Sequence, residues 1–280
     1  MTDTDPGLQD LKHLHPEWEP WLAVVQAMLS EIAEPKWDTV VPPCPQTRSK
    51  VPFLAGAELH LEKSLIRPLL AHLVHVACRS RTPKMATLAA VAQSELDNLT
   101  LFKASLHQDS NHLTEIAGAL GVDCEALQAV AGLLPVPFLQ ACNRHWNQFV
   151  RADWAEGYCP ICGTWPAFAE VRGIERSRYL RCDRCGGEWQ MHCLSCPYCG
   201  ITDHNELVSL VAENGASNVV IDACKRCLGY VKVFTTLQGS PPAKVILDDL
   251  ASVELDVVAA EQGYKRPAGG GYFLDITVSM

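Results

Sequence analysis

Four short cysteine motifs lie between residues 159 and 227, and each has the form C-x-x-C. Two cysteines at this spacing can direct two thiolates toward one point, which is half of a tetrahedral metal site. Four pairs supply enough thiolates for two closed four-cysteine sites. The pairs are Cys159 and Cys162, Cys182 and Cys185, Cys196 and Cys199, and Cys224 and Cys227.

Glycines next to these motifs favour metal binding over redox chemistry. Gly163, Gly186 and Gly200 directly follow the second cysteine of three motifs, and Leu228-Gly229 follows the fourth. A chain that turns sharply around an ion, with N–H groups directed at the sulfurs, needs a positive φ that glycine tolerates. A thioredoxin-type dithiol would instead occur once, at the start of a helix. We therefore predict structural metal sites built from the knuckles found in zinc ribbons and rubredoxins.

The spacing of the motifs predicts which of them share an ion. Gaps of 19 residues after Cys162 and 24 after Cys199 each fit a strand, a turn and a returning strand, whereas the 10 residues after Cys185 fit a linker that carries Trp189. Local loop closure is also entropically favoured. The other two pairings, including an interleaved cross-brace, are the alternatives. We expect a first site of Cys159, Cys162, Cys182 and Cys185, and a second site of Cys196, Cys199, Cys224 and Cys227.

The other cysteines have no comparable spacing. Cys193 forms an overlapping C-x-x-C with Cys196 and is a spare thiol, a replacement ligand or strand filler. The odd total of 13 cysteines does not indicate a disulfide framework. The isolated ones are expected to be small buried apolar groups; they are Cys44, Cys78, Cys124 and Cys142.

The charge balance argues against a nucleic-acid partner. The chain has a formal net charge of −9, and residues 151–230 contain 8 Lys and Arg against 10 Asp and Glu. Each four-thiolate site with a divalent ion adds a charge of about −2, whereas phosphate contact needs a basic face. An arginine-rich hairpin is the local exception, and it is either a solvated hairpin or a basic patch for an acidic protein surface. Its arginines are Arg172, Arg176, Arg178, Arg181 and Arg184.

Hydropathy predicts a cytoplasmic protein without membrane insertion. No uninterrupted apolar stretch approaches 18 residues. Residues 1–10 are polar and acidic, without the charged and apolar regions of a signal peptide.

The sequence contains no catalytic motif. No Gly-rich phosphate loop, nucleophile elbow or catalytic carboxylate pair is present, and His72 and His75 lack a third ligand. We therefore predict no catalytic residues and no organic cofactor.

Hydrophobic periodicity predicts an α+β multidomain chain. Apolar residues at helical intervals predict helices over about 16–32, 56–80, 85–107, 113–120, 124–134 and 138–152. The C-terminal part is expected to contain a strand at 244–247, a helix from Asp248 to near Gly263, and a loosely held tail at 272–280. The predicted divisions are an all-α domain over 1–152, a first rubredoxin-like or zinc-ribbon module over 153–192, and a second over 193–280 with a C-terminal helix and tail.

Several of these residues carry a family resemblance. Arg178 to Cys182, Glu188-Trp189, Asp222-Ala223-Cys224, Tyr230-Val231-Lys232 and the stretch from Asp248-Asp249-Leu250 to Gly263-Tyr264 resemble the formate dehydrogenase accessory protein FdhE family. The similarity covers about residues 153–267 closely and the helical half less closely.

The resemblance implies a function that spacing alone does not. Members of the family are cytoplasmic, non-catalytic assembly factors that act on the catalytic subunit of respiratory formate dehydrogenases. They have a helical domain followed by two rubredoxin-like modules, each with one iron or zinc ion; tetrahedral thiolates suit both metals. The alternatives are a rubredoxin-like electron carrier, a zinc-ribbon nucleic-acid-binding protein, and a sulfur- or metal-transfer enzyme that uses Cys193.

Overall fold

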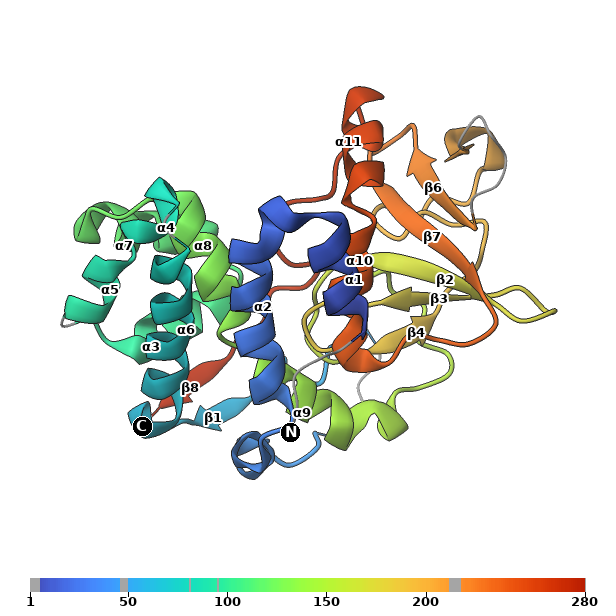
Figure 1. Ribbon diagram of the computed structural model, residues 1–280. Coiled ribbons are helices and arrows are strands. Elements are labelled where there is room, and N and C mark those ends of the chain that lie inside the picture. Colours follow the sequence, from blue (N-terminus) through green and yellow to red (C-terminus); the bar gives the residue numbers. More distant parts are fainter. Residues whose placement is uncertain (1–5, 46–49, 81, 95, 212–217, 280) are drawn as a thin grey trace. The chain divides into compact units, whose positions relative to one another are not determined.

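The computed structural model describes residues 6–45, 50–80, 82–94, 96–211 and 218–279. Residues 1–5 and Met280, which belong to the predicted N-terminal segment and tail, lie outside these ranges. Tertiary contacts divide the chain into two compact units (Figure 1). The helical unit comprises Met1–Pro43, Gly56–His145 and Asp275–Met280, and the sheet unit comprises Cys44–Ala55 and Trp146–Leu274.

The helical unit is built almost entirely from α-helices. The core of α2 and α3 is apolar, with Leu22, Met28, Ile66 and Leu73 fully buried. The helices are α1 (Pro6–Leu14), α2 (Glu19–Ile32), α3 (Lys63–Arg79), α4 (Pro83–Ala86), α5 (Ala89–Gln93), α6 (Asn98–Leu106), α7 (Ser110–Leu120), α8 (Cys124–Leu133) and α9 (Val136–Trp146). Short 3-10 turns, η1 (Pro16–Trp18) and η2 (Pro35–Val40), flank α2.

Capping side chains explain where the predicted helices divide. The expected helix over 85–107 is interrupted, and α6 starts anew because the Asp97 side chain accepts a hydrogen bond from the Leu99 N–H. Asp109 and Asp123 cap α7 and α8 in the same way. Gly121, with φ +65°, ends α7 as predicted. The sequence pattern missed α1.

The last residues of the chain belong to the helical unit. Strand β8 (Thr277–Ser279) pairs in parallel with β1 (Glu58–His60), and the Leu61 N–H donates to the Ser279 carbonyl at 3.0 Å. Ile276 is 3% exposed. The prediction of a loosely held tail was therefore wrong for the described part of it, and the predicted helix over 56–80 begins only after β1.

The sheet unit contains one six-stranded sheet of order β4-β3-β2-β7-β6-β5. Each half is a three-stranded antiparallel meander, and β2 pairs with β7 in parallel, Phe168 opposite Lys232, to join the halves. The strands are β2 (Phe168–Arg172), β3 (Ser177–Arg181), β4 (Glu188–Gln190), β5 (Leu207–Leu210), β6 (Val219–Cys224) and β7 (Tyr230–Thr236). Two further 3-10 turns are η3 (Asn147–Phe149) and η4 (His204–Glu206).

Two C-terminal helices pack on this sheet (Figure 1). Val245 of α10 (Val245–Ala251) packs with Phe168, and Ala259 of α11 (Val253–Glu261) packs with Ile221 and Tyr230. The strand predicted at 244–247 was wrong, because Lys244 ends the turn η5 (Pro242–Lys244) and Val245 starts α10. The 10 residues after Cys185, which were predicted to be a linker, contain β4, and Trp189 of this strand is 2% exposed.

The predicted fold class is confirmed: an all-α region precedes a sheet region with two four-cysteine groups and C-terminal helices. The predicted boundaries near 152 and 192 stay a prediction. One helical stretch, Cys124–Phe149, is long and apolar enough by composition to cross a membrane, but 72% of its most apolar window is buried, as in a core helix.

Candidate metal centres

All four C-x-x-C motifs fold into the same hydrogen-bonded turn, which we call a knuckle. In each, the N–H of the residue after the second cysteine donates to the carbonyl of the first cysteine, as from Gly163 to Cys159 at 2.9 Å. The N–H of the first cysteine in turn donates to the carbonyl of the residue five positions later, as from Cys196 to Ile201 at 2.9 Å. The equivalent bonds recur at Cys182 and Cys224. The repeated geometry places both sulfurs of a knuckle on one side of the turn.

The fifth residue of every knuckle has a positive φ. Gly163, Gly186 and Gly200 have φ values of +69°, +72° and +71°, and Leu228 takes the same position in the fourth knuckle with φ +58°. Left-handed backbone is costly for a residue with a Cβ. The fourth knuckle therefore forms the common turn with the less suitable residue.

The knuckles meet in two groups. Within each group the four sulfurs lie within 4.8 Å of one another, and the groups contain the residues expected from sequential pairing. Sulfur–sulfur contacts between the two knuckles of the first group are 3.4 Å (Cys159 to Cys185) and 3.5 Å (Cys162 to Cys182). The corresponding contacts in the second group are 3.6 Å (Cys196 to Cys227) and 3.7 Å (Cys199 to Cys224). A tetrahedral ion with metal–sulfur bonds of about 2.3 Å separates its sulfurs by about 3.8 Å, so both donor sets fit iron or zinc.

Burial distinguishes the two groups. The cysteines of the first group are at most 1% exposed. In the second group Cys196 and Cys224 are buried, but Cys199 is exposed and Cys227 is partly exposed.

Two buried thiols of the first group, Cys182 and Cys185, retain their protons at neutral pH unless an ion replaces them. Burial raises the pKa of Cys182 and Cys185 well above the ordinary thiol value. Burial also acts on Cys162, but hydrogen bonds from Cys159, Cys182 and Cys185 hold its pKa well below that value. One thiolate is thus stabilised by protonated neighbours. Filling the site with metal must release protons, so affinity should fall as the pH falls.

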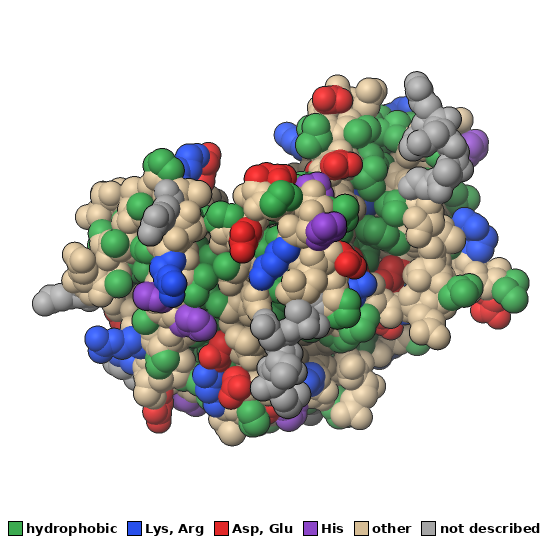
Figure 2. Space-filling model, in the orientation of Figure 1, with side chains coloured by type: hydrophobic (Ala, Val, Ile, Leu, Met, Phe, Trp, Pro, Cys, Tyr) green, Lys and Arg blue, Asp and Glu red, His purple; other side chains and the backbone are tan. Residues whose placement is uncertain are grey.

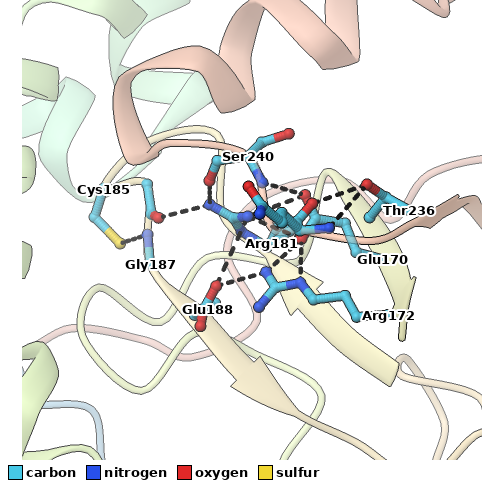
Figure 3. A network of polar contacts seen from close by, with 10 residues as sticks. Glu170, Arg172, Arg181, Cys185, Gly187, Glu188, Thr236 and Ser240 are labelled. Atoms are coloured by element: carbon cyan, nitrogen blue, oxygen red, sulfur yellow. Dashed lines mark hydrogen bonds and ion pairs between the residues drawn. The ribbon is translucent and has the colours of Figure 1, made fainter. Parts of the chain in front are cut away.

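A largely buried ion network lies next to Cys185 of the first group (Figure 3). Arg181 donates to both carboxylate oxygens of Glu170, at 3.0 and 2.9 Å, and to the carbonyls of Ser240 and Gly186 at 2.7 and 3.4 Å. Arg172 pairs with Glu170 and Glu188. Because Gly186 is the fifth residue of a knuckle, the network ties that turn to β2, β3 and the Ser240 segment.

This network overturns the interpretation of the arginine hairpin as a basic patch. Arg178 and Arg181 are 2% and 1% exposed, and Arg184 is 9% exposed. The Arg172 side chain is 16% exposed and paired. Only Arg176, of the five, is exposed. Arg178 instead donates to the carbonyls of Cys193 and Ser195 at 3.2 and 3.0 Å, which positions the loop before Cys196.

A second ion network holds the C-terminal helices on the sheet. Lys232 of β7 is fully buried and pairs with Asp249 and Asp256 at 2.8 and 3.0 Å. Arg266 pairs with the same two carboxylates at 2.6 and 2.8 Å, and the Tyr230 hydroxyl donates to Asp256 at 2.6 Å. Residue types alone did not reveal this cluster, because its members lie far apart in the sequence.

The remaining candidate residues stay outside the two groups. Cys193 is exposed, lies in a loop rather than a strand, and belongs to neither group. Of the four isolated cysteines, only Cys142 is fully buried. His72 and His75 are exposed residues of α3. Figure 2 shows His, Lys and Arg side chains together on the surface of the helical unit. Within the described residues, the two cysteine groups are the clusters of potential ligands.

Known proteins resemble this chain in sequence and in fold. Residues 191–273, which contain the second group, match the family described as "FdhE, C-terminal domain". The resemblance to FdhE is confirmed. The chain is 34% identical over 145 residues to an FdhE homolog of Stutzerimonas stutzeri, 32% over 120 residues to one of Aquifex aeolicus, and 30% over 142 residues to FdhE of Escherichia coli.

These alignments cover 42–48% of the chain and 42–47% of each relative, so the chain spans less than half the length of the curated relatives that it matches. The fold similarity extends further. The crystal structure of the FdhE protein from Pseudomonas aeruginosa aligns with 96% of this chain and 93% of its own, with a TM-score of 0.57 and 22% identity. At that identity the likeness shows a shared fold.

Proposed function

We propose that this chain is a cytoplasmic, non-catalytic accessory protein that binds the catalytic subunit of a formate dehydrogenase during its assembly. The observation that carries the proposal is the match of residues 191–273 to the FdhE C-terminal domain, together with the FdhE-like fold over nearly the whole chain. The two four-cysteine groups in the sheet unit fit the rubredoxin-like modules of that family.

The metal sites would serve this function by fixing loop shape. Cys159, Cys162, Cys182 and Cys185 would hold one iron or zinc ion, and the four cysteines of the second group another. Four thiolates complete a tetrahedral shell and leave no open position for a substrate. Each ion would cross-link two knuckles and so hold the loops between them in a single conformation. This supports a scaffold that presents a binding surface rather than an active site.

Client capture tests the proposal directly. The affinity-tagged chain is co-expressed with the formate dehydrogenase catalytic subunit of the same organism and purified with its metals. We expect the subunit to co-purify with the wild-type chain and with Cys193→Ser, because Cys193 lies in neither group. Cys162→Ser should lose one ion and weaken capture, because the folding of small metal modules is coupled to metal binding. A wild-type chain with two ions that fails to retain the subunit would refute the proposal.

The absence of catalysis needs its own measurement. The purified metal-replete chain is incubated with formate and an artificial electron acceptor. We expect no turnover above a protein-free control, because closed four-thiolate sites cannot bind formate at the metal. Turnover that is abolished by Cys162→Ser or Cys224→Ser would show an enzyme instead.

A further inference from the structure

The two groups offer an incoming ligand very different access to their sulfurs. An ion held by four thiolates leaves when water, a chelator or another thiol reaches it or replaces a sulfur. In the first group all four cysteines are at most 1% exposed. In the second group Cys199 is exposed and Cys227 is partly exposed. A competing ligand can therefore approach the second group without any change in the fold.

The surroundings of the first group close it further. The Phe53 and Leu54 N–H groups donate to the carbonyls of Pro160 and Ile161, at 2.8 and 3.0 Å, inside the first knuckle. The Tyr272 backbone N–H donates to the Gly163 carbonyl at 2.9 Å. Two chain segments remote in sequence thus cover one knuckle. On the other knuckle, Pro242 packs so closely that a Cβ added at Gly186 would lie 2.5 Å from the Pro242 Cβ.

The second group is more open. Among the described residues, no atom lies within 4 Å of a Cβ added at Gly200, the fifth residue of its first knuckle. The equivalent residue of its other knuckle, Leu228, is 47% exposed. A cavity of about 140 Å³ adjoins the group and is lined by Cys196 and Cys224, the two buried ligands. There is room for water or a small ligand on the cavity side as well as on the Cys199 side.

We propose that the second group is an exchangeable metal site and the first a permanent one. This inference rests on the proposed metal binding of the eight cysteines. The ion at Cys196, Cys199, Cys224 and Cys227 enters and leaves through the exposed Cys199 side, with the metal–sulfur bond to Cys199 the first to be replaced. The ion at the first group exchanges only after local opening of the segments that cover it, which costs additional free energy.

Metal release distinguishes the sites. The full-length chain, loaded with two zinc ions, is mixed with an excess of a chromogenic chelator at neutral pH. We expect two phases of one equivalent each, with the second slower by at least about tenfold because it requires local opening. A single rate constant for both ions would overturn the proposal, and so would a chain that binds fewer than two ions. Client capture plays no part in this readout. A negative result in the metal-release experiment would therefore leave the proposed accessory function untouched.

Alkylation assigns the phases. Iodoacetamide is added when the first equivalent has left, and modified cysteines are identified by peptide mass spectrometry. Cys199 and Cys227 should be modified at this stage, while Cys159 and Cys185 remain protected. Cys199→Ser should remove the fast phase, whereas Cys193→Ser, an exposed thiol outside the group, should leave both phases unchanged. Modification of the first group before the second would overturn the proposal even if Cys199→Ser fails to fold.

Discussion

The fifth residue of each knuckle has the same backbone conformation but different neighbours. Gly186 and Gly200 have φ values of +72° and +71°. A Cβ at Gly186 would lie 2.5 Å from the Pro242 Cβ and 2.7 Å from its Cα, whereas no atom of the part of the chain that the structure describes lies within 4 Å of a Cβ at Gly200. Substitutions at Gly186 and Gly200 therefore separate two costs in stability, that of left-handed backbone and that of steric crowding.

We expect Gly200→Ala to destabilise the sheet unit by about 1 kcal/mol, the strain of left-handed backbone alone. Gly186→Ala should lose about 2–4 kcal/mol, because overpacking adds about 1–3 kcal/mol. Urea unfolding of the zinc-loaded variants, followed by tryptophan fluorescence, measures the difference. Equal losses would show that Pro242 yields to the added methyl group.

At the scale of the elements, the buried Glu170–Arg181 pair fastens β2, β3 and the Ser240 segment together. Burial opposes the ionisation of Glu170, but the Ser240 N–H and the guanidinium groups of Arg181 and Arg172 more than compensate, so its pKa lies below the ordinary value. A carboxyl whose pKa is lowered on folding stabilises the fold above its unfolded pKa. That contribution is lost as the pH falls through the folded pKa.

Glu170→Gln should destabilise the sheet unit by about 3–5 kcal/mol at pH 7, because it removes the buried counter-ion of Arg181 and leaves only the half-exposed Glu188 nearby. The stability gap from the wild type should begin to shrink as the pH falls below the ordinary glutamate pKa of about 4.3, where Glu170 of the unfolded wild-type chain takes up a proton. The gap should close once the pH falls below the lowered folded pKa, where the folded carboxyl is protonated as well. Glu188→Gln is the matched control: its side chain is 47% exposed, so the loss should stay below about 1 kcal/mol. Chemical denaturation at pH 7 and in acid measures the difference in unfolding free energy between each variant and the wild type. A gap that stays constant into acid would contradict the assigned role.

The sequence predicted the elements whose information is local. Cysteine spacing predicted two hairpins, β2–β3 and β5–β6. Helical periodicity predicted α2, α7 and α8 closely, but it started α3 too early and ended α9 too late. It could not show that β2 pairs with β7, because that pairing joins residues about 60 positions apart in the chain. A short apolar run such as Val245-Ile246-Leu247 reads equally as strand or buried helix. The packing of Val245 against Phe168 favours the helix in the folded chain.

The candidate sites were predictable in composition but not in environment. Four repeated motifs named all eight cysteines of the two groups. Nothing in the motifs indicated that one group is buried and the other partly exposed, because Phe53, Pro242 and Tyr272 reach the first group from distant parts of the chain. For the same reason the arginine hairpin was misread: the acid partners of its buried arginines include Glu170 and Asp222, on neighbouring and remote strands.

At the scale of the whole chain, the C-terminal residues complete the unit that the N-terminal residues begin. Deletion of residues 275–280 removes β8 and the buried Ile276. We expect the thermal transition of the helical unit, followed by circular dichroism, to fall by at least about 4 °C, since loss of a buried side chain costs more than 1 kcal/mol. Bound zinc should stay at two ions per chain, because the eight cysteines and their surrounding segments lie in the other unit. An unchanged transition would show that β8 contributes no stability.

The pairing of β1 with β8 also has a consequence for biosynthesis. Domains generally fold from the N-terminus while the ribosome still extends the chain. Here β1 is made early, but its partner strand β8 follows all eight cysteines of the two groups along the chain. The helical unit therefore reaches its final form only after both cysteine groups have been translated. Translation products that stop between the two strands would lack β8, so their incomplete helical units would offer proteases a means of recognising them.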